Sequence, residues 1–163
     1  MNLSQDSAPN LHFQPFAHSW VAIHPNPKGI IQFVGSFFIF GSLPTVFYYF
    51  LLKNLYAQGY TIIAYPSSLI PPLLWKSMLV NHWAASIQLL QEELIIKAEL
   101  IAYLLKYTDR KFLQIYLNQE NYVWLGHSLG CKYISLLEVL SNEPQNLVNN
   151  LEQCGITNKQ LPI

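Results

Sequence analysis

Short apolar runs rich in β-branched and aromatic residues recur along the chain, at residues 20–23, 30–34, 60–65 and 122–125. Runs of this length and composition predict β-strands, and the proline- and glycine-rich segments around them predict turns. The third run stops at Pro66, which has no backbone N–H to donate to a neighbouring strand. We therefore expect four strands.

Helical periodicity fills much of the sequence between these runs. Ser42 as an N-cap, with Pro44 in the first turn, predicts a helix over 45–56 that ends near Gly59. The strongest helical pattern covers 84–107. Further helices are expected over 128–140 and from Ser141 to near Gly155.

The pattern over 84–107 contains two apolar stripes. The first stripe consists of Ile87, Leu90, Leu94, Ala98, Ile101 and Leu105. A second stripe consists of Leu89, Ile96, Leu100 and Leu104. Glu93 and Lys97 lie four residues apart, so they are expected to form an ion pair on this helix. Because apolar residues occupy more than one side, other elements should cover the helix well.

Strands and helices alternate along the chain, which is typical of the α/β class. The expected architecture has three layers, a mostly parallel sheet with helices on both faces. Residues 1–17 lack regular periodicity and are expected to form a loose N-terminal arm. Residues 18–163 would then form one domain.

The charge balance argues against nucleic acid as a partner. Nine basic and nine acidic residues cancel, and the longest basic cluster is only Arg110 and Lys111. Cys131 and Cys154 show neither a disulfide framework nor metal-ligand spacing, so we expect no metal and no cofactor. Residues 1–10 contain neither the basic nor the apolar region of a secretory signal, which favours a cytoplasmic location.

One uncharged stretch, 30–52, is long enough to span a membrane. Gly35, Gly41, Ser42 and Pro44 interrupt it, and this punctuation favours a strand, a turn and the start of a helix. We therefore expect no stable membrane span. Membrane association through this stretch remains a minor alternative.

The residues with the clearest chemistry are Gly126-His127-Ser128-Leu129-Gly130, which match the pattern G-x-S-x-G. This pattern lies directly after an expected strand and directly before an expected helix, as in the nucleophile elbow of α/β-hydrolases. Such an elbow needs small residues at its two outer positions, because the backbones crowd there. Ser128 is the predicted nucleophile, and Gly126, His127 and Gly130 complete the elbow. A plain glycine-punctuated turn is the alternative.

A hydrolase of this kind also needs backbone N–H groups that bind the oxyanion of the transition state. The N–H of Leu129, at the start of the helix after the elbow, is the first predicted donor. The second is expected in the loop after residues 30–34, from Ser36 or Phe37, because Gly35 permits close approach of the backbone. Val34 stands where these hydrolases usually carry a histidine, and a plain turn is again the alternative.

Three segments carry a resemblance to a known family: WVAIHPNPKG at 20–29, GYTIIAYP at 59–66 and WLGHSLGCKY at 124–133. They resemble an uncharacterised family of α/β-hydrolase-like proteins, domain of unknown function 1350, over most of residues 18–140. The resemblance implies an α/β-hydrolase fold, a site centred on Ser128, and occurrence in cyanobacteria and plant plastids. It implies no substrate.

The catalytic pattern is incomplete after Ser128. In α/β-hydrolases an acid and then a histidine follow the serine in the chain. Here all the histidines precede it: His12, His18, His24, His82 and His127. His127 is expected to pack beside the sheet. His24 is expected to bond solvent or backbone, with lining of the site as the alternative.

The acids that follow Ser128 are Glu138, Glu143 and Glu152, and each is expected on the solvated face of a structural helix. A full fold of this type has about eight strands and well over 200 residues. We therefore expect 18–163 to be the N-terminal part of an α/β-hydrolase domain, without the strands that carry the acid and the histidine. The strand 122–125 would then be an open, apolar sheet edge.

Two functions follow from these observations. The first is a serine hydrolase that cleaves an ester, thioester or amide of a small-molecule acyl substrate through Ser128, and that is inactive or weakly active alone. The second is a non-catalytic binding or assembly module on the same half-sheet, which pairs its open edge with a partner or with a second copy.

Overall fold

The computed structural model describes residues 9–36, 43–66, 78–107 and 110–142, and of residues 78–85, 110 and 140–142 it describes the backbone alone. Its strands are β1 (Gln14–Phe16), β2 (Ser19–Ala22), β3 (Gly29–Val34), β4 (Tyr60–Tyr65) and β5 (Tyr122–Gly126). Its α-helices are α2 (Pro44–Phe47), α3 (Tyr49–Ala57), α4 (Met78–Tyr107), α5 (Leu113–Leu117) and α6 (Leu129–Asn142). Short 3-10 helices, η2 (Arg110–Phe112) and η3 (Gln119–Asn121), flank α5. The helix expected from Ser141 to near Gly155 lies largely outside the described residues.

The described strands form one sheet in the order β1-β2-β4-β3-β5. β3 pairs in parallel with β4 and with β5, so that Gln32 stands opposite Ile63 on one side and Trp124 on the other. β2 runs antiparallel to both β1 and β4. The sheet is therefore mixed, and the expectation of a mostly parallel sheet is wrong.

The physical reason lies at the start of the chain. Only Ala17 and His18 connect β1 to β2, and two strands joined by so short a connection must be antiparallel, because a parallel pair needs a crossover of a dozen or more residues. β1 lies inside the segment 1–17, which the sequence pattern assigns to a loose arm. The strand has only three residues, too few for alternation to stand out.

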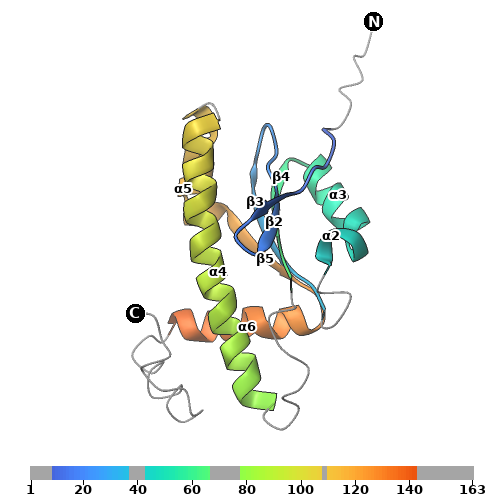
Figure 1. Cartoon of the computed structure of the whole chain (residues 1–163), viewed down its shortest axis with the longest axis vertical. Coiled ribbons are helices and arrows are strands. Elements are labelled where there is room, and N and C mark those ends of the chain that lie inside the picture. Colours follow the sequence, from blue (N-terminus) through green and yellow to red (C-terminus); the bar gives the residue numbers. More distant parts are fainter. Residues whose placement is uncertain (1–8, 37–42, 67–77, 108–109, 143–163) are drawn as a thin grey trace, which may run out of the picture.

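Helices cover both faces of the sheet (Figure 1). Side chains of β3 alternate between the faces: Ile30 and Val34 pack with residues of α4, α5 and α6, whereas Ile31 and Phe33 pack with residues of α3. The α/β class expected from the sequence is thus confirmed. Among the described residues, no helix is both long enough and apolar enough to cross a bilayer.

Of the two apolar stripes on α4, one is fully buried against the sheet. The residues buried on it are Leu89, Ile96, Leu100 and Leu104, which is the second stripe of the pattern. Leu94 and Leu105 of the first stripe are 62% and 55% exposed. Glu92 and Glu93 lie on the same side of α4 as this second stripe. Both carboxylates have polar partners in the sheet, which favours burial of this side.

Glu93 belongs to a buried polar network between α4 and the centre of the sheet. Its Oε1 accepts from Lys97 Nζ at 2.6 Å and from Gln32 Nε2 at 3.1 Å. Gln32 Oε1 in turn accepts from the Tyr65 hydroxyl at 2.8 Å. Burial, helped by nearby Glu93 and Glu92, raises the pKa of Tyr65 well above its usual value, so the phenol keeps the proton that it donates. Because every member has a partner, the network stabilises β3 and β4 against α4.

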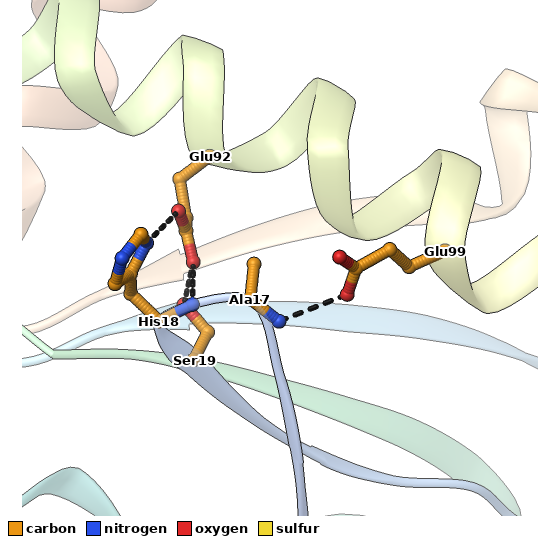
Figure 2. A network of polar contacts seen from close by, with 5 residues as sticks. All are labelled: Ala17, His18, Ser19, Glu92 and Glu99. Carbon is orange, nitrogen blue, oxygen red and sulfur yellow. Dashed lines mark hydrogen bonds and ion pairs between the residues drawn. The ribbon is translucent and has the colours of Figure 1, made fainter.

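Glu92 ties the hairpin of β1 and β2 to α4 (Figure 2). Its Oε1 accepts from the backbone N–H of His18 at 2.7 Å and from Ser19 Oγ at 3.0 Å, and its Oε2 lies 3.2 Å from His18 Nδ1. Glu99, seven residues further along α4 and on the same face, accepts from the N–H of Ala17 at 2.9 Å. Ala17 has a φ of 46°, so these carboxylates hold a turn in the left-handed region.

Replacing Glu92 with Gln is expected to lower the free energy of unfolding by about 1.5–3 kcal/mol, because a buried carboxylate that accepts several hydrogen bonds is lost. Glu99→Gln is the matched control, since its single contact is exposed, and it should cost less than about 1 kcal/mol. Urea denaturation measures both. Equal losses in the two variants would show that Glu92 does not anchor the hairpin.

Candidate functional site

The connections after β3 and β5 diverge to opposite faces of the sheet. β3 leads through α2 and α3 to β4 on one side, and α3 packs with Ile31 and Phe33. β5 leads to α6, which lies against α4 on the other face (Figure 1). β3 and β5 are neighbours, so the strand order reverses between them. In open α/β sheets, ligands bind beside the carboxyl ends of strands at such a switch point.

Ser128 lies at this switch point, in the turn between the end of β5 at Gly126 and the start of α6 at Leu129. Its φ is 56°, in the left-handed region that L-residues rarely adopt, and its side chain is exposed. Such a conformation costs a non-glycine residue about 1–2 kcal/mol, and strain of this kind concentrates at functional sites. The predicted nucleophile is thus held in a strained turn and open to solvent.

The glycines on either side of Ser128 are needed for space. A Cβ on Gly130 would collide with the carbonyl oxygen of Val34 and come within 2.9 Å of Gly35 O. A Cβ on Gly126 would lie 2.7 Å from the backbone nitrogen of Cys131. Neither glycine has a positive φ, so close approach of the first turn of α6 to β3 and β5 is the reason for both.

Hydrogen bonds join the segments that follow β3 and β5. The N–H of His127 donates to Val34 O at 3.0 Å. The N–H of Ser36 donates to the Tyr48 hydroxyl at 3.0 Å, and that hydroxyl lies 2.9 Å from His127 Nδ1. The structure therefore brings Ser36 and His127 together beside Ser128, whereas Phe37 lies outside the described residues.

Tyr48 is a member of this group that sequence reasoning missed. It sits between α2 and α3, where the sequence predicts a continuous helix over 45–56. Nothing in an apolar run with several aromatic residues distinguishes this tyrosine from its neighbours. Only the break between the two helices and the proximity of β5 give its hydroxyl a polar environment.

Leu129 is the first residue of α6. The N–H groups of Gly130 and Cys131 donate to His127 O and Ser128 O at 3.1 Å each. Within the described part of the chain no partner is found for the N–H of Leu129, as is usual in the first turn of a helix. This donor, at the positive end of the helix dipole, is available to an anion beside Ser128.

Two histidines with polar partners lie away from Ser128. His18 pairs with the acid Glu92, but β4 and β3 separate β2 from β5, and three strand spacings amount to about 14 Å. His24 is buried and its backbone bonds Thr61, near the amino end of the parallel strands. Its Nδ1 accepts from the N–H of Asn26, so the expected backbone bond is present and His24 does not line the site.

Among the side chains that the structure describes, the remaining acids and histidines place no base beside Ser128. His12 precedes β1, the strand farthest from β5 in the sheet. The side chain of His82 and residues Glu143 and Glu152 lie outside what the structure describes, and Glu138 is exposed on α6. No cluster of three or more His, Cys, Asp or Glu that could bind a metal occurs among the described residues.

The strain at Ser128 predicts an unusual order of stability. Ser128→Gly should be more stable than Ser128→Ala by about 0.5–1 kcal/mol, because relief of left-handed strain, about 1–2 kcal/mol, exceeds the extra entropy cost of glycine, about 0.5–1 kcal/mol. Ser135, inside α6 and exposed, provides the control pair. There alanine should be the more stable by about 1 kcal/mol. The same order at both positions in chemical denaturation would contradict the strained turn.

Gly130→Ala should destabilise the protein by about 2 kcal/mol or more, although alanine is the better helix former by about 1 kcal/mol. The added methyl group would force α6 away from the backbone of Val34. Ser135→Ala in the same helix is the control and should change stability little. A variant at position 130 as stable as the wild type in urea denaturation would disprove the close contact of α6 with β3.

Comparisons with known proteins identify a family but no relative with an assigned activity. No curated protein and no solved structure matches the chain. A family model matches residues 12–151, a range that includes every strand of the sheet, Tyr48 and Ser128. The chain therefore belongs to the family described as "protein of unknown function (DUF1350)".

Proposed function

We propose that the chain carries the nucleophile of a serine hydrolase of the α/β-hydrolase type, which acts on an ester, thioester or amide of a small-molecule acyl substrate. The observation that carries the proposal is the φ of 56° at Ser128, in a turn between a parallel strand and a helix. In α/β-hydrolases the nucleophile sits on a sharp turn of this kind, so that its hydroxyl is exposed at the carboxyl end of the sheet.

The topology of the sheet supports the same assignment. The order β1-β2-β4-β3-β5, with β2 antiparallel to its neighbours, is the order of the first five strands of α/β-hydrolase sheets. Their nucleophile follows the fifth strand, as Ser128 follows β5. On this proposal, residues 14–142, from β1 to the end of α6, correspond to the N-terminal part of that fold.

The proposed reaction starts when Ser128 Oγ attacks the carbonyl carbon of the substrate. The developing oxyanion accepts a hydrogen bond from the N–H of Leu129, and the positive end of α6 stabilises the charge. An imidazole must take the proton of the serine. Because no histidine follows Ser128 in this sequence, the base is one of the histidines that precede it or belongs to another polypeptide segment.

A second function is favoured by one observation, the position of β5. Within the described residues β5 pairs only with β3 and ends the sheet, and Val123 on it is 51% exposed. An unpaired edge with apolar side chains is a template for pairing with another strand. A non-catalytic assembly module would use this edge, and light scattering of the purified chain would then report a stable dimer or larger complex.

Labelling with a fluorophosphonate tests the hydrolase. The probe is expected to modify the wild type at Ser128, identified by peptide mass spectrometry, and to leave Ser128→Ala unmodified. Ser135→Ala is the matched control, because Ser135 is also exposed on α6 but lies within the helix, and it should label as the wild type does. A folded wild type that stays unlabelled, or labels elsewhere, would rule out Ser128 as an activated nucleophile.

A further inference from the structure

The second oxyanion donor expected from the sequence is already engaged. The N–H of Ser36 donates to the Tyr48 hydroxyl at 3.0 Å, so an oxygen atom occupies the position that a bound oxyanion would take on this N–H. A substrate oxyanion could reach Ser36 only if Tyr48 left. The hydroxyl of Tyr48 therefore occupies the position beside the Ser36 N–H where the oxyanion was expected.

The hydrogen-bonding capacity of that hydroxyl leaves room for a donor role. A tyrosine hydroxyl has one proton to donate and lone pairs to accept with, and the N–H of Ser36 uses the accepting side. The contact with His127 Nδ1, at 2.9 Å, has either direction, because it depends on the tautomer of the imidazole. When Nδ1 carries a proton and donates, the hydroxyl of Tyr48 accepts twice and its own proton is free for a third partner.

The ring of Tyr48 is held in position for such a role. It packs on Phe33 of β3, with ring centroids 4.7 Å apart, and on His127 at 5.5 Å. The residue is half-buried at the junction of α2 and α3, and its contacts with Phe33 of β3 and with His127, directly after β5, fix its orientation. Preorganised donors of this kind stabilise a developing negative charge without rearrangement.

We propose that the hydroxyl of Tyr48 is the second oxyanion donor of the Ser128 site, acting with the N–H of Leu129. This inference rests on the proposed function. When Ser128 Oγ bonds to the carbonyl carbon, the π-electron pair of the carbonyl moves to its oxygen, and the proton of the serine passes to an imidazole base. The oxyanion then accepts from Tyr48 Oη and from Leu129, while the N–H of Ser36 keeps the tyrosine in place.

The kinetics of fluorophosphonate labelling test this role in the purified chain. In that reaction Ser128 Oγ forms a bond to phosphorus, and fluoride leaves with the electron pair of the P–F bond. The imidazole base takes the proton of the serine. Tyr48→Phe removes only the hydroxyl. It should lower the maximal rate constant of labelling about 100-fold, the usual effect of losing one oxyanion donor, and should leave the probe concentration at half-maximal rate within about two-fold.

Tyr49→Phe is the matched control, since Tyr49 is the next residue, is 38% exposed, and has an apolar neighbour in the same helix. It should label at the wild-type rate. Tyr48→Leu also removes the hydroxyl, with different packing, and gives the same readout if the phenylalanine variant does not fold. Circular dichroism confirms that each variant compared is folded.

The outcomes separate the two proposals. If the wild type is labelled at Ser128 but Tyr48→Phe is labelled as fast, Tyr48 is no donor and only this inference is overturned. Faster labelling of Tyr48→Phe overturns it as well, and shows that the hydroxyl obstructs the site. If the wild type is not labelled at all, the proposed hydrolase fails, and the assignment of Tyr48 fails with it.

Discussion

The carbonyl group of Val34 is the point on which the geometry around Ser128 depends. It accepts the N–H of His127, which extends the parallel pairing of β3 and β5 to the residue before the serine. It also lies so close to Gly130 that no side chain fits between them. The backbone must therefore turn sharply between His127 and Gly130, and Ser128 takes a left-handed φ to complete the turn.

This constraint places polar groups from separate parts of the chain around one point. Ser36 follows β3, Tyr48 joins α2 to α3, and His127 follows β5, yet the Tyr48 hydroxyl contacts both of the others. The start of α6 adds the N–H of Leu129 and the positive end of a helix dipole. Beneath them, the buried bonds of Gln32, Tyr65 and Glu93 hold the sheet against α4. The proposed oxyanion site requires a rigid sheet of this kind to hold its donors in place.

The sequence pattern predicted the parts of the fold whose local signals are strong. The boundaries of strands β2, β3, β4 and β5 lie within one residue of the expected runs, because each run combines β-branched or aromatic residues with clear turn signals. The break of the helix at Tyr48 and the short helix α5 were not expected, since neither has a cap that stands out in the sequence. The long helix α4 was expected, but its first apolar stripe is covered less well than expected, since Leu94 and Leu105 are exposed.

These failures share a physical cause, namely contacts between residues far apart in the chain. Partners of Glu92 and Glu93 in the sheet determine which face of α4 is buried. These partners lie far from α4 in the chain, so the sequence of the helix does not reveal them. Glycine spacing could point to Ser128, because the turn is local. It could not point to Tyr48, whose hydroxyl contacts a residue 79 positions away in the chain.

The backbone of Ser128 in solution offers the most direct test of this account. Nuclear magnetic resonance scalar couplings between the amide and α protons, and between the α carbon and its proton, distinguish a left-handed residue from a helical one. We expect couplings of a left-handed φ at Ser128, followed by helical values from Leu129 onward. Helical couplings that run without interruption through residues 127–130 would remove the strained turn, and with it the reason to assign chemistry to this serine.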